Sequence, residues 1–510
     1  MEWHLNATVS GKGPLPLRMI LYGEGGTGKS KVIQTISALF AERGMSSLLQ
    51  KTAYTGIAAS LIDGQTMHTL CGMSVKQRGR MSMEAKRWLE ETWGKKLYLI
   101  INECSMISKS FLQKFAMKIK QGRNSVDDED WWGGLNVIIC GDFHQFPPVA
   151  VGCNEYLFMP TKEEGMSHSK IIGGKIYEEF QTVIILKEQK RVHDEVWLQF
   201  LRRLRHGSVS RDNISMLRSL IMSPSTNALS DENSWRTLSM ITPQHAVRTL
   251  WNEEACREMC CSLGQTLFIC PALDSIGEQP LTSQQRLKVK ASLMSNKMKV
   301  LPDEVELVVG MKILVTYNVE IDMDITNGAR GTIVRIVLDP RESILSKQAI
   351  HRLKYLPKYI LVRLDRTRMS KLSGLDDNVV PVEPMTMPIE IRNGKDGSQM
   401  KLSIKRTQFP LTGGYVFTDY RSQGQTISQA IVDIAPPPWG TLTLFNLYVA
   451  LSRCPSRNDI HLLRDFDPDM LLKAHDENLL RADERLEHLN DFSRRWWQRL
   501  RERERADSGY

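Results

Sequence analysis

The segment GEGGTGKS at residues 23–30 limits what this chain can fold into more than any other feature. It matches the pattern G-x-x-x-x-G-K-[ST] in full, follows an apolar run at 17–22 and precedes a helical run at 31–41. In this order of strand, glycine-rich loop and helix, backbone N–H groups and the helix N-terminus surround phosphate oxygens. The sequence therefore predicts a parallel α/β sheet with a phosphate-binding loop at the carboxyl end of one strand.

Each residue type in this loop suits a bound nucleotide. Glycines allow the tight anion-binding turn, the Lys29 ammonium reaches the β- and γ-phosphates, and the Ser30 hydroxyl binds Mg²⁺. We therefore expect ATP and Mg²⁺ as ligands, with nucleotide contacts from Gly23, Gly25, Gly26, Thr27, Gly28, Lys29 and Ser30. A chance glycine-rich turn is the alternative. The loop by itself does not name a function, because kinases, GTPases, transporters and helicases all share it.

The bulk composition narrows the class of protein. With 510 residues the chain is too long for one core, and about three domains are expected. No apolar run reaches the roughly 18 residues of a membrane span, so we expect no membrane partner. The net charge of +9 suits a polyanionic partner, but a solvated basic surface would give the same value. The nine scattered cysteines form no zinc-ligand set and predict reduced, buried thiols.

A polar motif follows each of two further apolar strands, which are expected at 97–101 and 137–140. After the first strand, Glu103 is placed to orient an attacking water, and Asn102 is placed to contribute to the Mg²⁺ shell. After the second strand comes GDFHQFPPV at 141–149, in which the Gln145 amide can both donate to and accept from a γ-phosphate. A capping or ion-paired carboxylate is the alternative for Glu103, and an ordinary loop position is the alternative for Gln145.

Further motifs occur in a fixed order along the chain. They are TGIAAS at 55–60, GQTMHT at 64–69, Lys190-Arg191 with LRRLRHG at 201–207, TDYRSQGQT at 418–426 and LYVALSR at 447–453. Together with GDFHQFPPV, these motifs resemble those of PIF-type DNA helicases of superfamily 1B, in particular the helitron-like, fungal-type subgroup. The resemblance implies ATP hydrolysis, 5′→3′ movement on single-stranded DNA, and roles in DNA repair, recombination and telomere maintenance.

The resemblance also implies a fold made of two RecA-like domains with a small SH3-like β insertion in the second. The expected limits are 1–180 for the first domain, 181–330 with 410–475 for the second, 331–409 for the insertion, and 476–510 for a C-terminal amphipathic helix. Along that last segment, apolar residues recur at three- or four-residue spacing, at Leu486, Leu489, Phe492, Trp496 and Leu500.

Residues of the later motifs receive roles from the resemblance. Arg191 and Arg453 would come from the second domain to stabilise charge on the γ-phosphate, and Gly424 would contact the nucleotide. An ion pair on the surface or between domains is the alternative for either arginine. DNA contacts are expected from Thr55, Gly56, His68, Thr418 and Ser422, although a helix cap or a satisfied core position would suit the same side chains. For Phe143, Trp131 and Trp132 we expect core packing rather than base stacking.

Three features depart from the family pattern. Asn102 stands where an Asp normally supports Mg²⁺, and it keeps an acceptor oxygen without the negative charge. Asp419-Tyr420-Arg421 stands where many members carry a His-Lys pair. The chain begins too close to the phosphate-binding loop for the upstream Gln-containing motif that reads adenine, so we expect relaxed base selectivity or a shortened chain.

An ATP-driven DNA helicase is the leading hypothesis, with single-stranded DNA and duplex junctions as partners. The first residues show no signal-peptide core, and the nucleus, or alternatively the mitochondrion, is the expected compartment.

Two alternative functions stay open. One is a DNA-binding relic that turns over no ATP, which Asn102 motivates. The other is an accessory ATPase of transposition that docks a partner on the tail helix. The sequence leaves the oligomeric state open.

Overall fold

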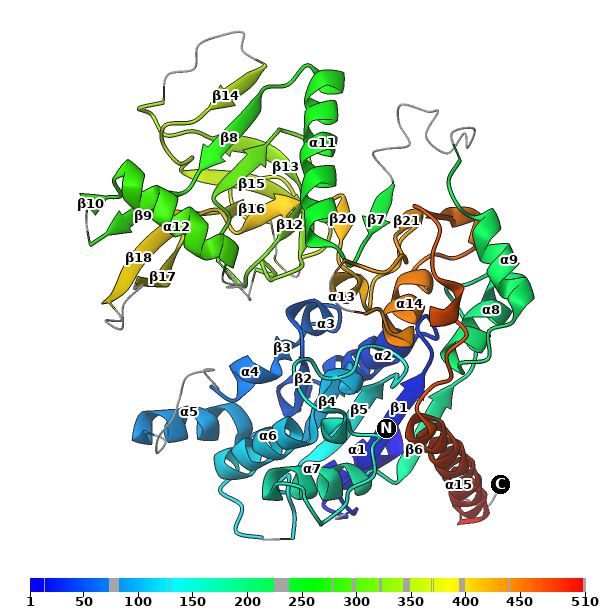
Figure 1. The fold of residues 1–510 in the computed structure, drawn as a ribbon. Coiled ribbons are helices and arrows are strands. Elements are labelled where there is room, and N and C mark those ends of the chain that lie inside the picture. Colours follow the sequence, from blue (N-terminus) through cyan, green and yellow to red (C-terminus); the bar gives the residue numbers. More distant parts are fainter. Residues whose placement is uncertain are drawn as a thin grey trace. The chain divides into compact units, whose positions relative to one another are not determined.

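The computed structural model describes residues 1–12, 14–72, 82–127, 129–223, 238–277, 279–295, 300–320, 323–342, 349–367, 369, 371–393, 400–438 and 441–507. The chain forms two compact units. The first unit is made of Met1–Pro243 together with Thr418–Tyr510, and the second is the continuous segment Gln244–Phe417. Figure 1 labels the elements of both units and colours them along the sequence.

A parallel sheet forms the centre of the first unit (Figure 1). Its strand order is β3-β2-β4-β5-β1-β6, with β1 (Arg18–Gly23), β2 (Leu49–Ala53), β3 (Gln65–Thr66), β4 (Tyr98–Asn102), β5 (Asn136–Gly141) and β6 (Thr182–Leu186). Every pairing in this sheet is parallel, with Ile20 opposite Ile139 and Thr52 opposite Ile101. Because β4, β5 and β1 are neighbours, the polar motifs that follow these strands begin at one edge of the sheet.

Both faces of this sheet are buried. In β1, Ile20 and Tyr22 enter one core cluster, whereas Leu21 between them enters the other. The strands β4 and β5 alternate in the same way. Successive side chains of a strand point to opposite faces, so an uninterrupted apolar strand needs helices on both sides.

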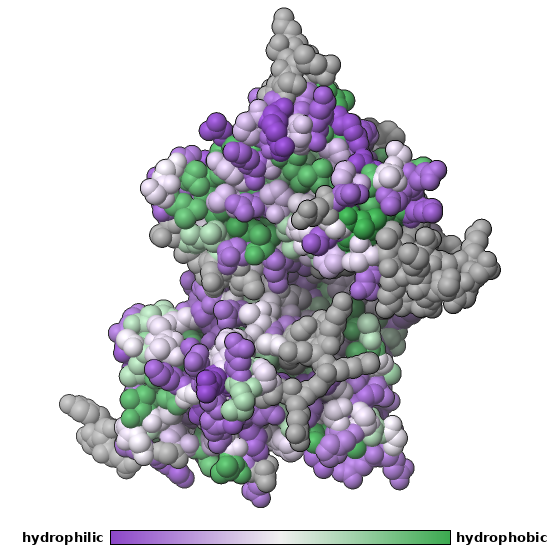
Figure 2. Space-filling view, turned by 90° about the vertical axis from the view of Figure 1, so that its left-hand side faces the viewer, coloured by the Kyte–Doolittle hydropathy of each residue, from purple (hydrophilic) through white to green (hydrophobic). Residues whose placement is uncertain are grey.

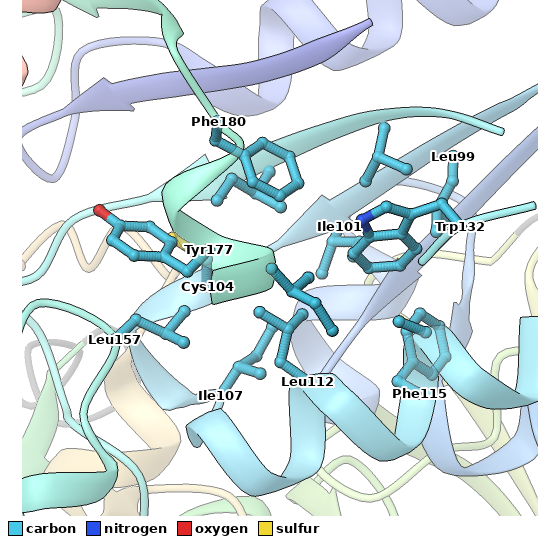
Figure 3. Packing of buried hydrophobic residues seen from close by; sticks show 14 of the residues in the cluster. Leu99, Ile101, Cys104, Ile107, Leu112, Phe115, Trp132, Leu157, Tyr177 and Phe180 are labelled. Carbon is cyan, nitrogen blue, oxygen red and sulfur yellow. The ribbon is translucent and has the colours of Figure 1, made fainter. Parts of the chain in front are cut away.

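Different helices cover the two faces. The first face is covered by α5 (Met83–Trp93), α6 (Lys109–Gly122), α7 (His168–Glu178) and α15 (Glu477–Asp507), and the second by α1 (Glu2–Val9) and α2 (Lys29–Glu42). Figure 3 shows the first face, where Trp132 lies among Leu99, Phe115 and Phe180. Phe143 is buried in the same cluster and Trp131 packs against it, which confirms the expected core packing of these aromatic residues.

A second parallel sheet in the same unit includes β7 (Ser239–Ile241), β21 (Ala430–Val432) and β22 (Ile460–Leu462), with Ile431 opposite Met240 and His461. The other helices of the unit are α3 (Gly56–Ser60), α4 (Met67–Leu70), α8 (Glu195–Arg205), α9 (Arg211–Ser219), α13 (Asp419–Ser422) and α14 (Leu444–Leu451), within the described residues. Side-chain caps fix where several of them begin. Asp194 accepts from the N–H groups at the start of α8, and Thr443 forms a capping box with Asn446 at the start of α14.

The second unit is built mainly of antiparallel strands. One sheet has the order β16-β15-β13-β12-β19, with β12 (Lys312–Val315), β13 (Arg330–Val337), β15 (Tyr359–Leu364), β16 (Val379–Val382) and β19 (Leu411–Gly413). The other elements are α11 (His245–Leu263), α12 (Ser283–Ser295), β8 (Leu267–Pro271), β9 (Leu273–Ile276), β10 (Gln279–Pro280), β11 (Glu304–Leu307), β14 (Ile350–Arg352), β17 (Met385–Asn393), β18 (Met400–Gln408) and β20 (Val416–Phe417), within the described residues. A turn at Asn327-Gly328 precedes β13, and Gly328 has a φ of 98°.

The predicted α/β class is confirmed. The strands predicted at 17–22, 97–101 and 137–140 and the helix predicted at 31–41 differ from β1, β4, β5 and α2 by at most two residues at either end. The second compact unit is a longer segment than the β insertion predicted at 331–409. The four domain limits themselves stay predictions, and residues 508–510 of the predicted tail helix lie outside the described residues.

The helix α15 covers the edge strand β6. The N–H of Val183 donates to Ser493 Oγ at 2.9 Å, and the N–H of Ile185 donates to Asn490 Oδ1 at 3.0 Å. Leu479 is fully buried in the first core. An uncovered edge strand would present unpaired backbone donors, so this helix completes the sheet.

The surface is mixed in character. On the face drawn in Figure 2, hydrophilic residues cover most of the described surface, and apolar residues lie among them in small groups. Among the described residues, no helix is both long enough and apolar enough to cross a membrane. All cysteines are free, and most of them are buried, as the composition predicts.

Replacing Leu486 by Ala should lower the free energy of unfolding by about 2–5 kcal/mol, because its fully buried side chain would leave a cavity in the core beneath α15. Phe492→Ala is the matched control on the same helix. Its side chain is 60% exposed, so we expect a change of less than about 0.5 kcal/mol. Urea denaturation followed by circular dichroism measures both. Equal losses in the two variants would contradict the packing described for α15.

Candidate functional site

β1 runs directly into the glycine-rich loop, and α2 begins at the end of that loop. Gly26 and Gly28 have φ angles of 98° and 90°, a left-handed backbone that favours glycine. The Lys29 Nζ donates to the carbonyl oxygens of Gly23 at 2.6 Å and Glu24 at 3.0 Å. The ammonium therefore lies inside the loop, at a helix N-terminus, where an anion is stabilised.

The other predicted residues of the loop are close to Lys29. Thr27 is buried and its Oγ1 donates to the carbonyl oxygen of Glu24 at 2.9 Å, and Ser30 is half-buried in the first turn of α2. Burial lowers the pKa of Lys29, whereas the negative charges of Asp142 and Glu103 act in the opposite direction.

Glu103 follows β4 with a φ of 57° and a ψ of 53°. This left-handed conformation costs a residue with a Cβ about 1–3 kcal/mol, and such strain concentrates at functional sites. The Glu103 side chain is buried, and its Oε2 accepts from Gln423 Nε2 at 3.0 Å. A Cβ placed on Gly424 would lie 3.7 Å from Glu103 Oε1. The structure thus brings together Glu103 and the distant motif at 418–426.

Asn102 is the last residue of β4 and is buried. Its Nδ2 donates to the carbonyl oxygen of Ala58 in α3 at 3.4 Å. An aspartate has no donor for this carbonyl, so the bond gives a physical reason for an amide at this position.

Three predicted side chains converge on Gly25 in the glycine-rich loop. A Cβ placed on Gly25 would lie 3.2 Å from Arg453 Nη2, 3.4 Å from Gln145 Nε2 and 3.5 Å from Arg191 Nη1. The segment before Arg191 also holds the loop. Gln189 Nε2 donates to the carbonyl oxygen of Gly25 at 3.0 Å. Cationic and amide donors from three parts of the chain therefore meet at the phosphate-binding loop.

Both arginines bind protein oxygens that are uncharged. Arg453 is fully buried and donates to the carbonyl oxygen of Val449 and to Ser452 Oγ, both at 2.7 Å. Arg191 donates to Thr426 Oγ1 and to the carbonyl oxygen of Ser452, both at 3.0 Å. Neither has a carboxylate partner among the described residues. Burial, and next the neighbouring charge of Arg191, lowers the pKa of Arg453 to about 9.

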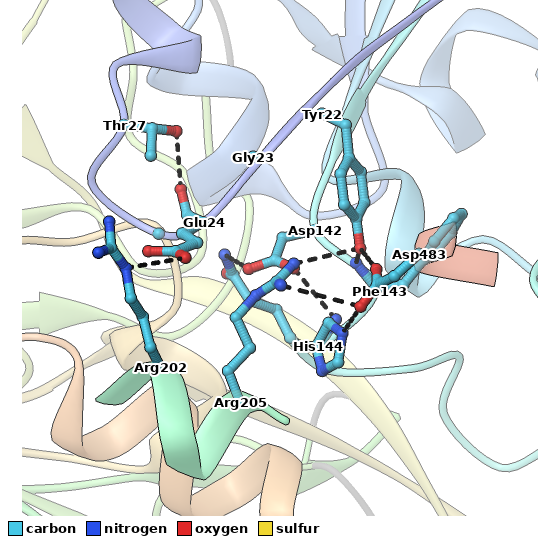
Figure 4. Close-up of polar contacts among 12 residues, drawn as sticks. Tyr22, Gly23, Glu24, Thr27, Asp142, Phe143, His144, Arg202, Arg205 and Asp483 are labelled. Atoms are coloured by element: carbon cyan, nitrogen blue, oxygen red, sulfur yellow. Dashed lines mark hydrogen bonds and ion pairs between the residues drawn. The ribbon is translucent and has the colours of Figure 1, made fainter. Parts of the chain in front are cut away.

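A buried polar network surrounds Asp142 (Figure 4). Arg205 Nη2 in α8 donates to Asp142 Oδ1 at 2.8 Å, and Gln145 Nε2 donates to Asp142 Oδ2 at 3.4 Å. The Tyr22 hydroxyl donates to Asp483 Oδ1 at 2.9 Å, and the same carboxylate lies 2.6 Å from His144 Nε2. The network joins β1, the motif after β5, α8 and α15.

Neighbouring cationic groups favour the ionised form of Asp142. Burial alone would raise the pKa of Asp142, but Arg205, His144 and Lys29 outweigh burial and lower it from 3.8 to about 2. Asp142 and His144 are fully buried, and Arg205 is almost so. A buried ion pair without a partner for each charge would be strongly destabilising, so these residues depend on each other.

Sequence interpretation assigns no role to Asp142, Tyr22, Arg205 or Asp483. Asp142 and Arg205 lie inside motifs that were identified, but the contact between them joins positions 63 residues apart. Asp483 has a detectable signal. It stands on the apolar face of the predicted tail helix, four residues after Leu479 and three before Leu486, where a carboxylate is unexpected.

The predicted DNA-contacting residues lie in different settings. Thr55 caps α3 and accepts from the N–H of Ala58 at 3.3 Å, and Gly56 is the first residue of that helix. His68 lies between Tyr54 and Phe111, with ring centroids 5.5 and 4.8 Å away. Their DNA contacts stay a prediction.

Two further residues of that prediction belong to the motif at 418–426. Thr418 is half-buried at the start of α13. Ser422 is fully buried, and its hydroxyl donates to the carbonyl oxygen of Asp419 at 2.7 Å. Beside them, Tyr420 stacks on Phe146, with centroids 4.0 Å apart and planes inclined by 16°. Tyr420 is 47% exposed, so this aromatic pair reaches the surface next to the motif.

The site fits a phosphate-bearing ligand. Lys29, Arg191 and Arg453 bring positive charge to one loop, and Gln145 Oε1 is buried without a hydrogen-bond partner among the described residues. An unpaired buried acceptor carries a desolvation cost that a hydrogen-bond donor on a ligand or water would remove. Within the described part of the chain, no group of three or more His, Cys, Asp or Glu residues could hold a metal by itself. A cation here would need ligands such as Ser30 and phosphate oxygens.

The sequence profile of the PIF1-like helicase family matches residues 5–213. The ATP-dependent DNA helicase PIF1 of Danio rerio is 24% identical over 475 residues, which are 92% of this chain and 61% of that protein. The ATP-dependent DNA helicase Pif1 of Bdellovibrio bacteriovorus is 27% identical over 450 residues, which are 87% of this chain and 84% of that protein. The chain therefore spans about three fifths of the length of the first relative.

Among solved structures, the Pif1 helicase from Candida albicans is similar to this chain with a TM-score of 0.64 and 23% sequence identity. The match covers 96% of this chain and 98% of that one. This likeness confirms the predicted fold of two RecA-like domains.

Asp142→Asn should make the free energy of unfolding depend less steeply on pH under acidic conditions. A carboxyl group with a lowered pKa in the folded state contributes stability above the unfolded value of 3.8, and the contribution is lost as pH falls toward about 2. From about pH 5 to about pH 3, the free energy of unfolding should fall more steeply in the unsubstituted protein than in the variant. Urea denaturation at constant ionic strength measures the slopes.

Asp465→Asn is the control for this comparison. The Asp465 side chain is 66% exposed and pairs with Arg218 at 3.4 Å, so screening by water leaves its effect small. Parallel slopes for all three proteins would mean that Asp142 is not held ionised by its buried partners.

Proposed function

We propose that this chain is a member of the PIF1-like helicase family and an ATP-driven DNA helicase. The observation that carries the proposal is the convergence of Arg191, Arg453 and Gln145 on Gly25. In phosphoryl transfer the protein has little covalent chemistry to perform. Its main tasks are to position the reactants and to stabilise charge on the transferred phosphoryl group.

Binding of ATP is assigned to the loop at 23–30 and to Gly424. The backbone N–H groups of the loop and the Lys29 ammonium face the phosphates, and the Ser30 hydroxyl is the protein ligand for the metal, with Asn102 in the surrounding shell. Mg²⁺, when bound, supplies positive charge that neutralises phosphate oxygens. The Lys29 bonds to Gly23 and Glu24 support this assignment, because they hold the ammonium within the loop.

Hydrolysis is assigned to Glu103, Gln145, Arg191 and Arg453. Glu103 orients the attacking water, Gln145 senses the γ-phosphate, and the two arginines stabilise the charge that develops there. Removal of such an arginine typically lowers the rate by about 10³ to 10⁵. The absence of a carboxylate partner for either arginine among the described residues supports a catalytic role over a structural ion pair.

Single-stranded DNA and duplex junctions are the proposed partners, and the nucleus is the proposed compartment. The relatives in Danio rerio and Bdellovibrio bacteriovorus are named ATP-dependent DNA helicases. Thr55, Gly56, His68, Thr418 and Ser422 are the proposed DNA contacts. Ser422 is fully buried, so its contact with DNA would require a rearrangement of α13. Movement 5′→3′ follows from the family alone.

A DNA-binding relic is the second candidate, because Asn102 lacks the charge that normally supports Mg²⁺. The hydrogen bond that the Asn102 side chain donates to the carbonyl oxygen of Ala58 favours a structural use of this position. Such a relic would bind DNA with an affinity that falls as salt rises, and would turn over no ATP.

Lys29→Ala should abolish ATP hydrolysis, and single-stranded DNA should stimulate hydrolysis in the unsubstituted protein, because DNA binding closes the catalytic groups on the nucleotide. Lys31→Ala is the matched control, since Lys31 is an exposed residue two positions further along α2 and should leave hydrolysis unchanged. Phosphate release with and without a single-stranded oligonucleotide measures both effects. Equal release with and without DNA would count against a helicase. Duplexes with 5′ or 3′ tails then report the direction of unwinding.

Asn102→Asp should lower the Mg²⁺ concentration that gives half-maximal hydrolysis, since a carboxylate binds the cation shell more strongly than an amide. A titration of Mg²⁺ at saturating ATP measures this value. A different outcome identifies the relic, namely an unsubstituted protein that releases no phosphate and a variant that does.

A further inference from the structure

The helix α15 presents one buried face to the first sheet. Leu479, Asp483, Leu486, Asn490 and Ser493 follow each other at four- and three-residue spacing and therefore share that face. Leu479 and Leu486 are fully buried in the core. Deletion of the tail would remove part of this core, so the helix is a component of the domain rather than a separate appendage.

The polar residues of this face fix where α15 lies along the sheet. Asn490 and Ser493 accept from two backbone N–H groups of β6 at 3.0 and 2.9 Å. These bonds are specific in position, because a shift of the helix by one residue would leave both edge donors without partners. The position of the helix therefore places the Asp483 side chain next to Tyr22 of β1.

At that point the Asp483 carboxylate meets three groups of the nucleotide domain (Figure 4). Its Oδ2 accepts from His144 Nε2 at 2.6 Å, and its Oδ1 accepts from the Tyr22 hydroxyl at 2.9 Å. Arg205 Nη1 lies 3.9 Å from Oδ2. A carboxylate has no proton to donate, so His144 carries its proton on Nε2.

The contacts continue from Asp483 to the phosphate-binding loop. The N–H of Phe143 donates to the Tyr22 hydroxyl at 3.3 Å, which fixes the backbone two residues before Gln145. Arg205 connects the Asp483 carboxylate with that of Asp142, and Asp142 accepts from Gln145 Nε2 at 3.4 Å. Two routes therefore lead from one carboxylate on α15 to the segment that carries Gln145.

We propose that Asp483 is a positioning residue of the nucleotide site, which holds the Asp142–Gln145 segment in the arrangement that hydrolysis requires. The proposal rests on the function proposed above. Without the Asp483 carboxylate, His144 would keep a buried N–H without an acceptor, and Arg205 would lose one of its two negative partners. The segment would relax, and Gln145 would move away from the γ-phosphate.

The first test compares Asp483→Ala with Glu487→Ala, the matched control one turn further along α15. Glu487 pairs with Lys187 at 2.8 Å on the surface and does not contact the network. Asp483→Ala should lower kcat for DNA-stimulated ATP hydrolysis by about tenfold to a hundredfold, because small displacements of a catalytic group have effects of this size. The affinity for a fluorescent ADP analogue should change by less than about twofold, since ADP lacks the γ-phosphate that Gln145 would sense.

The conservative variant Asp483→Asn distinguishes positioning from general stability. Asn keeps an acceptor oxygen for His144 and should recover part of the lost kcat, whereas a purely electrostatic effect on the site would not be rescued. Unchanged kcat in Asp483→Ala overturns the proposal. The proposal is also overturned if Asp483→Ala and Glu487→Ala lose kcat to the same extent and ADP affinity to the same extent, because this result would indicate loosening of the whole helix.

A readout without turnover separates this proposal from the proposed function. Hydrogen–deuterium exchange at residues 141–149 should be faster in Asp483→Ala than in the unsubstituted protein, and unchanged in Glu487→Ala. Exchange that is the same in all three proteins overturns the positioning role. An unsubstituted protein that hydrolyses no ATP overturns the proposed function instead, and the exchange comparison alone then decides the role of Asp483.

Discussion

The buried ion pair between Asp142 and Arg205 connects two segments that are distant in the sequence and that both border the candidate site. Asp142 follows β5 of the first sheet, and Arg205 is the last residue of α8, a helix that lies next to α14. Two charges taken out of water need each other and further hydrogen bonds, so neither residue can move alone. Tyr22, Gln145 and Asp483 are further partners of these two residues, and the same contacts hold Tyr22, Gln145 and Asp483 in place.

A different balance governs the phosphate-binding loop. Arg191 and Arg453 lie near Gly25 without carboxylate partners among the described residues, and burial together with their mutual repulsion lowers the pKa of Arg453 to about 9. Positive charge that is buried and unbalanced favours binding of an anion. The proposed triphosphate would supply negative charge, so the buried arginines would favour its bound state.

Rules that use only neighbouring residues were enough to predict the strands β1, β4 and β5. Adjacent residues such as Ile20 and Leu21 are buried on opposite faces of the sheet, so these strands are continuous apolar runs that can be recognised in the sequence. The same rules were enough for the loop around Lys29, because its left-handed backbone angles require glycines that can be recognised in the sequence. They did not reveal the setting of Ser422, because a serine in a polar motif has no sequence sign that its hydroxyl is turned inward to Asp419. They failed for Asp483, whose partners are 339 and 461 residues away.

The sequence by itself determined the phosphate-binding loop, the parallel α/β class and the order of the motifs, because each depends on residues that are neighbours along the chain. Only the tertiary structure decided that Arg453, Gln145 and Arg191 meet at Gly25, and that Asp483 of α15 contacts His144, the neighbour of Gln145. These contacts depend on how distant segments pack and on which buried charges are paired. Neither can be derived from the spacing of residues along the chain.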